Sequence, residues 1–461
     1  MLPFANLSRD SADVYLAEGL TEELISRLGA VARLRVPGRS VVVRAQAAVA
    51  DPQALARRLG VRYLVEGSVR RGGNRLRVSV RLLRAADGVR VWGEDYNRGQ
   101  EDLLDVQETI AREVATNVAG QLLPGERSVL VARPTRDPAA WDHFLRGNHA
   151  LGTRSAGSLA AAIREYHRAL ALDSTFTAAQ ARIAYAYVLA GLYGLEGIPA
   201  DSAAVRAERA AQRALLLDQN SSDAWLAWGW LRAGTNTASG MREARSALER
   251  AVRLDPRNAE AHHQLGQVLT FLGQDSAAVA TYERALAIDP LRAQTLYELS
   301  LVLSFSHRWV VTLRLADSAV AENPLLWRAR VGRARARLAT GDARGALEDA
   351  RRAHELGSGI AVYDALTVLV AAAAALGDTA SARGYQAAFE AAPSADFARG
   401  MLATGPAIGR IALGDREGAI AMLQTIPPSV IYSWILRYPE FDPIRADPRF
   451  QRIEAAARAA P

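Results

Sequence analysis

The chain has 461 residues, half of them hydrophobic, and a net charge of +7. Its 56 basic residues are all arginine, and its 49 acidic residues are interspersed with them. The sequence therefore contains no basic stripe of the kind that marks a nucleic-acid surface. Cysteine and lysine are both absent, which excludes disulfides, thiolate metal sites, cysteine nucleophiles and any phosphate loop or kinase signature that needs a lysine. No run of eighteen apolar residues and no signal-peptide pattern occur, so the sequence predicts neither a membrane-spanning helix nor a cleaved leader.

The first elements predict a small α/β domain over residues 1–123. Residues 2–4 read as the end of a strand, and Tyr15–Leu28 has leucines at helical spacing. Short strands are expected at Leu34–Val36 and Ser40–Arg44. Asp51 is a suitable N-cap, with Pro52 at the first position of a helix that runs to Leu59.

The second half of this domain predicts an antiparallel meander. Tyr63–Val69 is rich in β-forming residues, residues 70–74 form a turn, and Arg75–Leu82 alternates strictly between apolar and polar side chains. Ala86–Gly88 turns the chain into a returning strand, Val89–Tyr96. A helix is expected from Leu103 to Leu123, before Pro124 and Gly125.

This domain resembles the TolB-like N-terminal domain. The resemblance is carried by Leu2–Ser8, Gly19–Leu24, Leu59–Tyr63 and Glu66–Arg71, together with Trp92, Tyr96, Arg98, Asp102, Leu103 and Gln107. It implies that the domain is followed by tetratricopeptide repeats. It also implies a bacterial signalling protein in which a serine/threonine kinase, a nucleotide (adenylate) cyclase or a winged-helix domain lies upstream.

The start of the chain departs from that family pattern. Several apolar residues usually precede the Leu-Pro-Phe sequence, whereas here Met1 stands directly before Leu2. We expect the first strand to be interior or near-interior in its sheet and the chain to be a fragment or a shortened reading frame. An upstream membrane-anchored kinase or cyclase would place this part outside the cytoplasm, and without one it would be cytoplasmic.

The rest of the chain predicts helix pairs. A linker covers residues 124–138, about eight tetratricopeptide-like pairs cover residues 139–427, and a helical cap covers residues 428–461. The pattern is clearest in Ala259–Arg292, where Gly273 suits a helix end and Pro290 a helix stop. It resembles the tetratricopeptide repeat, whose period is 34 residues. The spacing of Ala278 and Ala285 recurs at Ala162/Ala169, Ala207/Ala214, Ala244/Ala251, Thr312/Ala319 and Ala346/Ala353, the last with Ser358 at the proline position.

No catalytic or metal-binding constellation stands out, so we predict that the chain is not an enzyme and has no cofactor. The first strand–helix connection lacks the glycines of a nucleotide site, and no histidines form a metal-ligand motif. The adjacent acids Glu22 and Glu23 diverge by about 100° on a helix, which argues against an acid/base pair.

Stacked helix pairs form a long concave surface that suits protein or peptide partners. The residues expected to point into that groove are Glu260, His263, Gln267, Phe271, Gln294, Tyr297 and Glu298. Arg330, Arg333 and Arg337 share one flank of a helix and could take an acidic peptide or phosphate. The alternative for these arginines is a solvated face that Glu348, Asp349 and Glu355 partly neutralise.

The sequence therefore predicts a non-catalytic interaction and regulatory or sensory module with protein or peptide partners. The alternatives are a stand-alone envelope-associated scaffold and, with less support, an enzyme whose site lies in the α/β domain.

Overall fold

The computed structural model describes residues 1–460 except 32, 50, 74, 132, 154–155, 194, 196, 358–359 and 392–397. Asn74 of the predicted turn and Ser358 of the repeat pattern lie outside the described residues. The chain forms two compact units. The first comprises Met1–Leu231, Arg250–Arg257 and Ile288–Pro290, and the second comprises Arg232–Glu249, Asn258–Ala287 and Leu291–Pro461.

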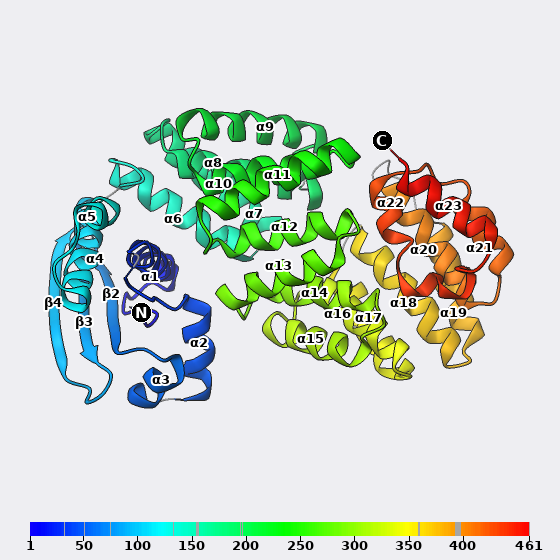
Figure 1. The fold of residues 1–461 in the computed structure, drawn as a ribbon, viewed down its shortest axis with the longest axis horizontal. Coiled ribbons are helices and arrows are strands. Elements are labelled where there is room, and N and C mark those ends of the chain that lie inside the picture. The colour runs from blue at the N-terminus through cyan, green and yellow to red at the C-terminus, as the bar shows by residue number, and fades with distance from the viewer. Residues whose placement is uncertain are drawn as a thin grey trace. The chain divides into compact units, whose positions relative to one another are not determined.

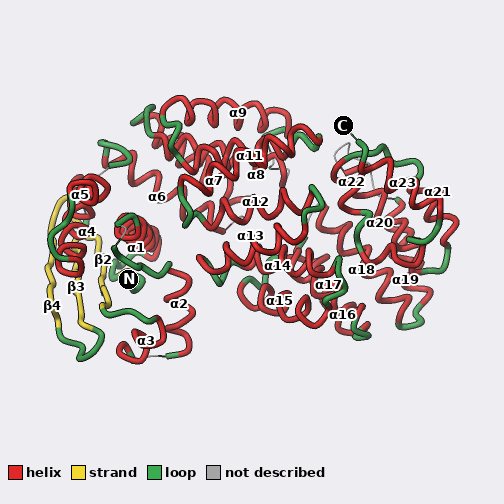
Figure 2. Tube along the Cα trace, in the orientation of Figure 1, coloured by secondary structure: helices red, strands yellow, loops and turns green. Residues whose placement is uncertain are grey.

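The first unit begins with a mixed sheet of four strands in the order β1-β2-β3-β4. Figure 2 shows the three longer strands, β2, β3 and β4. The strands are β1 (Ala5–Asn6), β2 (Tyr63–Gly72), β3 (Arg75–Arg84) and β4 (Arg90–Gly99). β1 runs parallel to β2, and the other neighbours are antiparallel. The predicted interior place of the first strand is wrong for the strands described. β3 pairs with β2 along its whole length, so β1 takes the other side of β2 and is the outermost strand.

One face of this sheet is covered by two helices. α1 (Val14–Gly29) packs on β1 and β2, and α4 (Leu103–Ala119), which follows the short helix η2 (Gln100–Asp102), packs on β3 and β4. The alternation predicted for Arg75–Leu82 is confirmed in β3. The apolar side chains of this stretch are at most 2% exposed, and Arg75, Arg77 and Arg81 are exposed. The predicted apolar stripe of α1 is buried as well, at Leu16, Leu20, Leu24 and Leu28.

Residues 34–44 differ from the prediction. Leu34–Val36 is not a strand, and Ser40–Arg44 lies inside α2 (Arg39–Ala48). Three consecutive valines favour a strand locally, but α2 buries Val42 and Ala45, three residues apart, as a helix face requires. The next helix, α3 (Pro52–Leu59), begins as predicted, with the Asp51 carboxylate accepting from the Ala54 N–H at 2.7 Å.

The predicted linker, residues 124–138, contains a helix of its own. α4 ends at Ala119, earlier than predicted, because Gly120 takes φ +75°, and α5 (Pro124–Val131) begins at the proline. Beyond it, α6 (Pro138–Thr153) packs on α1. The Tyr15 hydroxyl donates to Asp142 at 2.6 Å and accepts from Arg146 at 2.6 Å, so the α/β part and the first repeat helix share a polar junction.

Helix pairs follow along the described part of the chain (Figure 1). After α6 they are α7 (Ala156–Leu172), α8 (Thr177–Tyr193), α9 (Ala200–Leu217), α10 (Ser222–Ala233), α11 (Ala238–Leu254), α12 (Ala259–Phe271), α13 (Asp275–Ile288), α14 (Ala293–Ser304), α15 (Trp309–Glu322), α16 (Trp327–Ala339), α17 (Ala343–Leu356), α18 (Ile360–Ala375), α19 (Thr379–Glu390), α20 (Ala398–Ala412) and α21 (Arg416–Leu423).

The repeat spacing predicted from the sequence is confirmed by burial. Ala278, Tyr282 and Ala285 have no exposed surface, and the corresponding alanines of the other pairs are buried in the same way. Gly266 faces Tyr282 so closely that an added Cβ would stand 2.6 Å from the ring. Small residues therefore set the distance between the helices of a pair. Gly273 closes α12 with φ +70°, as its place in the pattern predicts.

The second unit ends in three short helices. These are α22 (Val430–Ile435), the 3₁₀ helix η3 (Pro439–Ile444) and α23 (Pro448–Arg458). Asp447 caps α23 and accepts from the Arg449 N–H at 2.8 Å. α23 packs on α21 and on α22.

Candidate functional site

The candidate site is the face formed by the first helix of each pair in the second unit. α12 packs on α14, α14 on α16, α16 on α18, and α18 on α20, so these helices form one continuous inner face. The residues predicted to bind a partner from α12 and α14 lie on or under this face.

On α12 the predicted residues make contacts within the chain. Glu260 forms an ion pair with Arg292 and accepts from Gln264 at 2.8 Å. His263 is 4% exposed, and its Nδ1 lies 3.0 Å from the buried Thr295 hydroxyl. This histidine is therefore buried rather than open to a partner. Gln267 and Phe271 are half-buried.

On α14 two of the three predicted residues are buried. Tyr297 is 3% exposed and Glu298 is 6% exposed, whereas Gln294 is half-buried. Gln267 Nε2 donates to Glu298 at 3.2 Å and joins the two helices. Burial raises the pKa of Glu298 to about 7, although the positive charge of Arg328 opposes that rise. His263, Tyr297 and Glu298 are buried, so they do not reach the surface at which the sequence analysis places them.

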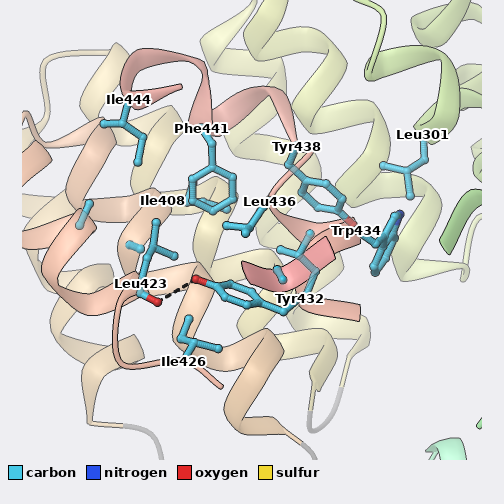
Figure 3. Close-up of a cluster of buried hydrophobic side chains, with 14 of the residues drawn as sticks. Leu301, Ile408, Leu423, Ile426, Tyr432, Trp434, Leu436, Tyr438, Phe441 and Ile444 are labelled. Atoms are coloured by element: carbon cyan, nitrogen blue, oxygen red, sulfur yellow. Dashed lines mark hydrogen bonds between the residues drawn. The ribbon is translucent and has the colours of Figure 1, made fainter. Parts of the chain in front are cut away.

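The chain's own C-terminal region lies on this inner face. We call residues 429–444, which include α22 and η3, the strap. α22 packs on both α12 and α20, and η3 packs on α20. The Trp434 ring meets Phe271 edge-on, with centroids 5.0 Å apart, and Tyr438 stacks on Phe305 at 5.8 Å. Figure 3 shows Trp434 and Tyr438 directed toward the helix that carries Leu301.

Charged groups hold the strap at three places. Arg437 donates to the Thr270 carbonyl at 2.8 Å and forms an ion pair with Asp275. Glu440 lies 2.9 Å from Arg335, and Asp442 lies 2.7 Å from His307. These contacts join the strap to helices and loops more than a hundred residues earlier in the chain.

Arg335 is the central cation of this face, and it is absent from the sequence-predicted site. Its guanidinium lies 2.8 Å from Asp364 of α18 and stands over the Tyr438 ring at 4.7 Å. Burial alone would lower the pKa of Arg335, but the carboxylates of Asp364 and Glu440 raise it above its ordinary value. The sequence contains a faint signal for this role, since Arg335 occupies the opposite flank of α16 from the arginine trio.

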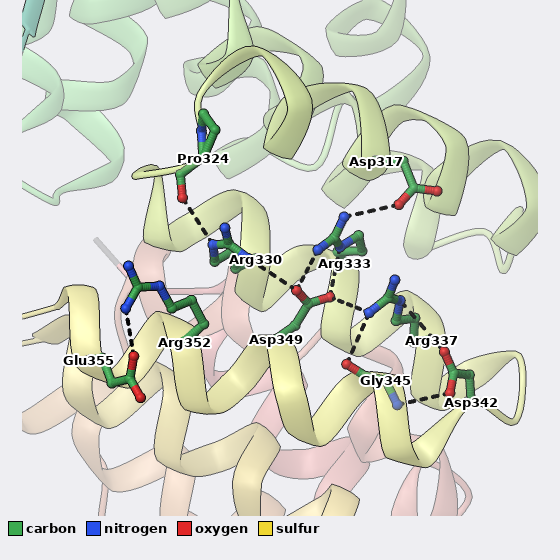
Figure 4. Close-up of polar contacts among 10 residues, drawn as sticks. All are labelled: Asp317, Pro324, Arg330, Arg333, Arg337, Asp342, Gly345, Asp349, Arg352 and Glu355. Carbon is green, nitrogen blue, oxygen red and sulfur yellow. Dashed lines mark hydrogen bonds and ion pairs between the residues drawn. The ribbon is translucent and has the colours of Figure 1, made fainter.

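The predicted trio of α16 converges on one carboxylate instead (Figure 4). Asp349 of α17 is 3% exposed and accepts from Arg333 at 2.5 Å, from Arg337 at 2.9 Å and from Arg330 at 3.5 Å. Of the acids predicted to neutralise this flank, Asp349 does so, while Glu355 pairs with Arg352. The trio thus forms an ion-pair network between α16 and α17, and its role toward a partner stays a prediction.

An open hollow of about 900 Å³ in the first unit is a weaker candidate. Residues 133–139 line it, together with Glu101, Asp142, His143, Leu172, Asp173 and Thr175. Arg133 there is paired with Asp105 and Glu108, His143 with Glu165, and Thr135 with Asp173. Most of its polar groups are therefore already used within the chain.

Within the described ranges, no three His, Asp or Glu side chains gather in a way that could hold a metal ion. No described helix combines the length and the apolar character needed to cross a membrane.

Comparison with known proteins agrees with the helix-pair geometry. Residues 241–299 match the family model described as tetratricopeptide repeat. A protein of Rhizobium meliloti (strain 1021) that bears the name of a candidate adenylate cyclase is 36% identical over 183 residues, which is 40% of this chain. The chain spans 31% of the length of that relative.

Among solved structures, the likenesses are distant. A thermophilic TPR protein of Thermus thermophilus is 20% identical, with a TM-score of 0.37, over 43% of this chain and all of that one. Yeast Tom70 is 15% identical, with a TM-score of 0.39, over 77% of this chain and 82% of its own. Identities of this size carry no function across. The helix pairs and the matched segment together show that this chain carries tetratricopeptide repeats behind a small α/β domain.

Proposed function

We propose that this chain is a non-catalytic protein-binding module with a regulatory role in a bacterial signalling protein. The observation that carries the proposal is the inner face of α12–α20, which accommodates a short peptide segment through aromatic and ion-pair contacts. A surface that holds one such segment has the shape and chemistry to hold a similar segment of a partner protein. Glu260, Gln267, Phe271 and Gln294, which retain some exposure, are the predicted residues best placed to reach a partner.

The signalling role is supported by the Rhizobium relative named as a cyclase and by the TolB-like resemblance. We propose that such a catalytic domain, a cyclase or a kinase, is the partner this module regulates, and that the chain itself performs no turnover. The network around Asp349 is a structural element in this proposal, and its partly exposed arginines are a second contact point for an acidic partner.

Photo-crosslinking in the source cell tests the binding role. A photoreactive amino acid at Gln294, on the inner face, is compared with one at Leu216, which is 77% exposed on α9. We expect a discrete adduct from Gln294 that Leu216 does not give. No adduct from either position would remove the support for this face as a binding surface.

Activity assays test the absence of turnover. The purified chain is expected to show no adenylate cyclase, ATPase or phosphatase activity above a blank. Activity that follows the protein through a second purification would favour the enzyme alternative. If the chain co-fractionates with the cell envelope and forms no crosslink to a signalling enzyme, the stand-alone scaffold would be favoured.

A further inference from the structure

The strap raises a question about the site itself, because a partner and the strap would use the same inner face. We propose that the strap is a resident ligand of this face, and that the face recognises peptides with the pattern Trp-x-x-Arg-Tyr-x-Glu-x-Asp, which the strap carries at Trp434–Asp442. This inference rests on the proposed function and names the chemistry of the partner. A partner bearing this pattern would displace the strap.

The strap's contacts fall outside the packing of the repeat array. In a solenoid each repeat contacts its neighbours, so α12 and α20 have no reason to be joined through the array itself. α22 nevertheless packs on both of them. The strap is therefore an addition to the array that lies where a ligand of a concave surface lies.

The two faces of the strap pack on different parts of the second unit, and both are buried. Tyr432, Leu436 and Phe441 are at most 1% exposed, the Tyr432 hydroxyl donates to the Leu423 carbonyl at 2.8 Å, and Phe441 stacks on Phe450 of α23. These contacts anchor the strap to α21 and α23. The opposite face meets the upstream helices through the rings of Trp434 and Tyr438, which Figure 3 shows. It also forms the ion pairs of Arg437, Glu440 and Asp442.

The upstream contact is part of the hydrophobic core of the second unit, but in the described part of the chain it leaves one small cavity and two unpaired donors. A cavity of about 30 Å³, room for one water molecule, remains among Arg335, Asp364, Thr404 and Tyr438. Trp434 Nε1 and Arg335 Nη1 are buried without a hydrogen-bond partner among the described residues. An unsatisfied buried donor is unfavourable, so a partner segment that offers an acceptor to Arg335 Nη1 would gain over the strap.

Affinity for the pattern should be masked by the tether. A segment attached to the chain competes at an effective concentration in the millimolar range, so a free peptide of equal intrinsic affinity binds poorly. Weakening the strap without touching the face should unmask the site.

The experiment uses the full chain and a fluorescent peptide of residues 429–445. Binding is measured by fluorescence anisotropy to the wild type and to a variant carrying Trp434→Ala and Arg437→Gln. We expect the variant to bind the peptide at least ten-fold more tightly than the wild type. A peptide with alanine in place of Trp434 and Tyr438 should bind neither protein.

Two further variants assign the binding to the inner face. Adding Arg335→Ala to the weakened strap should abolish the gain, because the peptide's glutamate and tyrosine lose their cation. Adding Arg352→Ala, an exposed position on α17 that pairs with Glu355, should leave the gain unchanged. Circular dichroism confirms that each variant is folded.

A second format covers the case in which the weakened strap unfolds the chain. A protease site between Pro427 and Pro428 of the otherwise native protein is cut after folding, and the labelled peptide is added in excess. Exchange of the peptide for the native strap supports the inference. A cut chain that keeps its strap, or a folded variant that binds the peptide no better than wild type, overturns it. The crosslink at Gln294 would persist in that case, so the proposed function would stand without the strap mechanism.

Discussion

Ala278 shows how a single methyl group sets the distance between two helices. It has no exposed surface, whereas Ala280, two residues along α13, is exposed. Leucine at position 278 adds volume to a filled contact, and we expect Ala278→Leu to lower the free energy of unfolding by about 1–3 kcal/mol. Ala280→Leu should change it far less. Chemical denaturation of both variants measures the difference, and equal losses would mean that the repeat register is wrong.

Glu298 gives the second unit a pH dependence. Its pKa rises from 4.5 to about 7 because it is buried, so between these values the folded chain holds a proton that the unfolded chain has released. Stability therefore falls as pH rises through this range and is level above it. Glu298→Gln should be stabilising relative to wild type at pH 8, by about 1–3 kcal/mol, and close to neutral at pH 4.

Unfolding free energies at both pH values test this. The control is Glu283→Gln, at an exposed position of α13. Its free energy of unfolding should depend on pH as that of the wild type does. If the free energy of unfolding of Glu298→Gln changed with pH as much as that of the wild type, Glu298 would not be the source of the pH dependence.

Asp349 carries the charge balance of the arginine trio. Three guanidinium groups face its carboxylate, and their side chains are 16–25% exposed. Removing one partner of a buried ion pair costs about 3–5 kcal/mol, and the partial exposure of the arginines puts Asp349→Asn at or below the lower end of that range. Asp317→Asn, at a half-exposed carboxylate that pairs only with Arg333 among the described residues, should cost less than about 1 kcal/mol. Thermal unfolding of the two variants would show the difference, and similar losses would contradict the central place of Asp349.

At the scale of single residues, the sequence predicted spacing better than exposure. The alanines of the repeat and the register of β3 follow from local periodicity, which a sequence displays directly. His263, Tyr297 and Glu298 were predicted to be open, yet they are buried through contacts with Thr295, with Gln267 and with the cluster that the strap completes. The contacts with Thr295 and Gln267 join neighbouring repeats, 32 and 31 positions apart, and those with the strap span more than a hundred positions. The periodicity of a single helix shows neither kind of contact.

At the scale of elements, those with a local sequence pattern were predicted correctly, and features that depend on tertiary packing were not. The helices and β2–β4 were recognised because each has its own amphipathic pattern. Ser40–Arg44 was predicted as a strand because three valines favour one, and the packing of Val42 and Ala45 decided for a helix. The α1–α6 contact was missed because its partners, Tyr15 and Asp142, lie 127 positions apart.

The α1–α6 junction leads to a prediction at this scale. Tyr15→Phe removes the hydroxyl that both Asp142 and Arg146 contact and leaves a buried carboxylate with one partner fewer. The expected cost is about 1–3 kcal/mol. Hydrogen exchange should quicken in α1 and α6 and stay unchanged in α14. Uniform quickening along the chain, or none, would show that the junction does not hold these helices.

At the scale of the whole molecule, removing residues 429–461, which are the strap together with α23, tests what this C-terminal region does for the second unit. The truncated chain should lose protection from hydrogen exchange in α12, α14 and α20, because their inner face becomes exposed to solvent. The strands β2 and β3 of the first unit serve as the internal reference and should exchange as before. Unchanged protection in α12 would mean that the strap contributes little to this face.

The polar junction between α1 and α6 also bears on how such chains can be recombined in evolution. Asp142, Arg146 and His149 of the first repeat helix find partners in Tyr15 and Glu18 of the α/β part. A genetic exchange that moved the repeats alone would leave these side chains without their partners. An exchange that moved the α/β part alone would expose the face of α1 that α6 covers. We therefore expect the α/β part to be inherited together with its first helix pair, with tolerated crossover points after α7 rather than in the segment before α6.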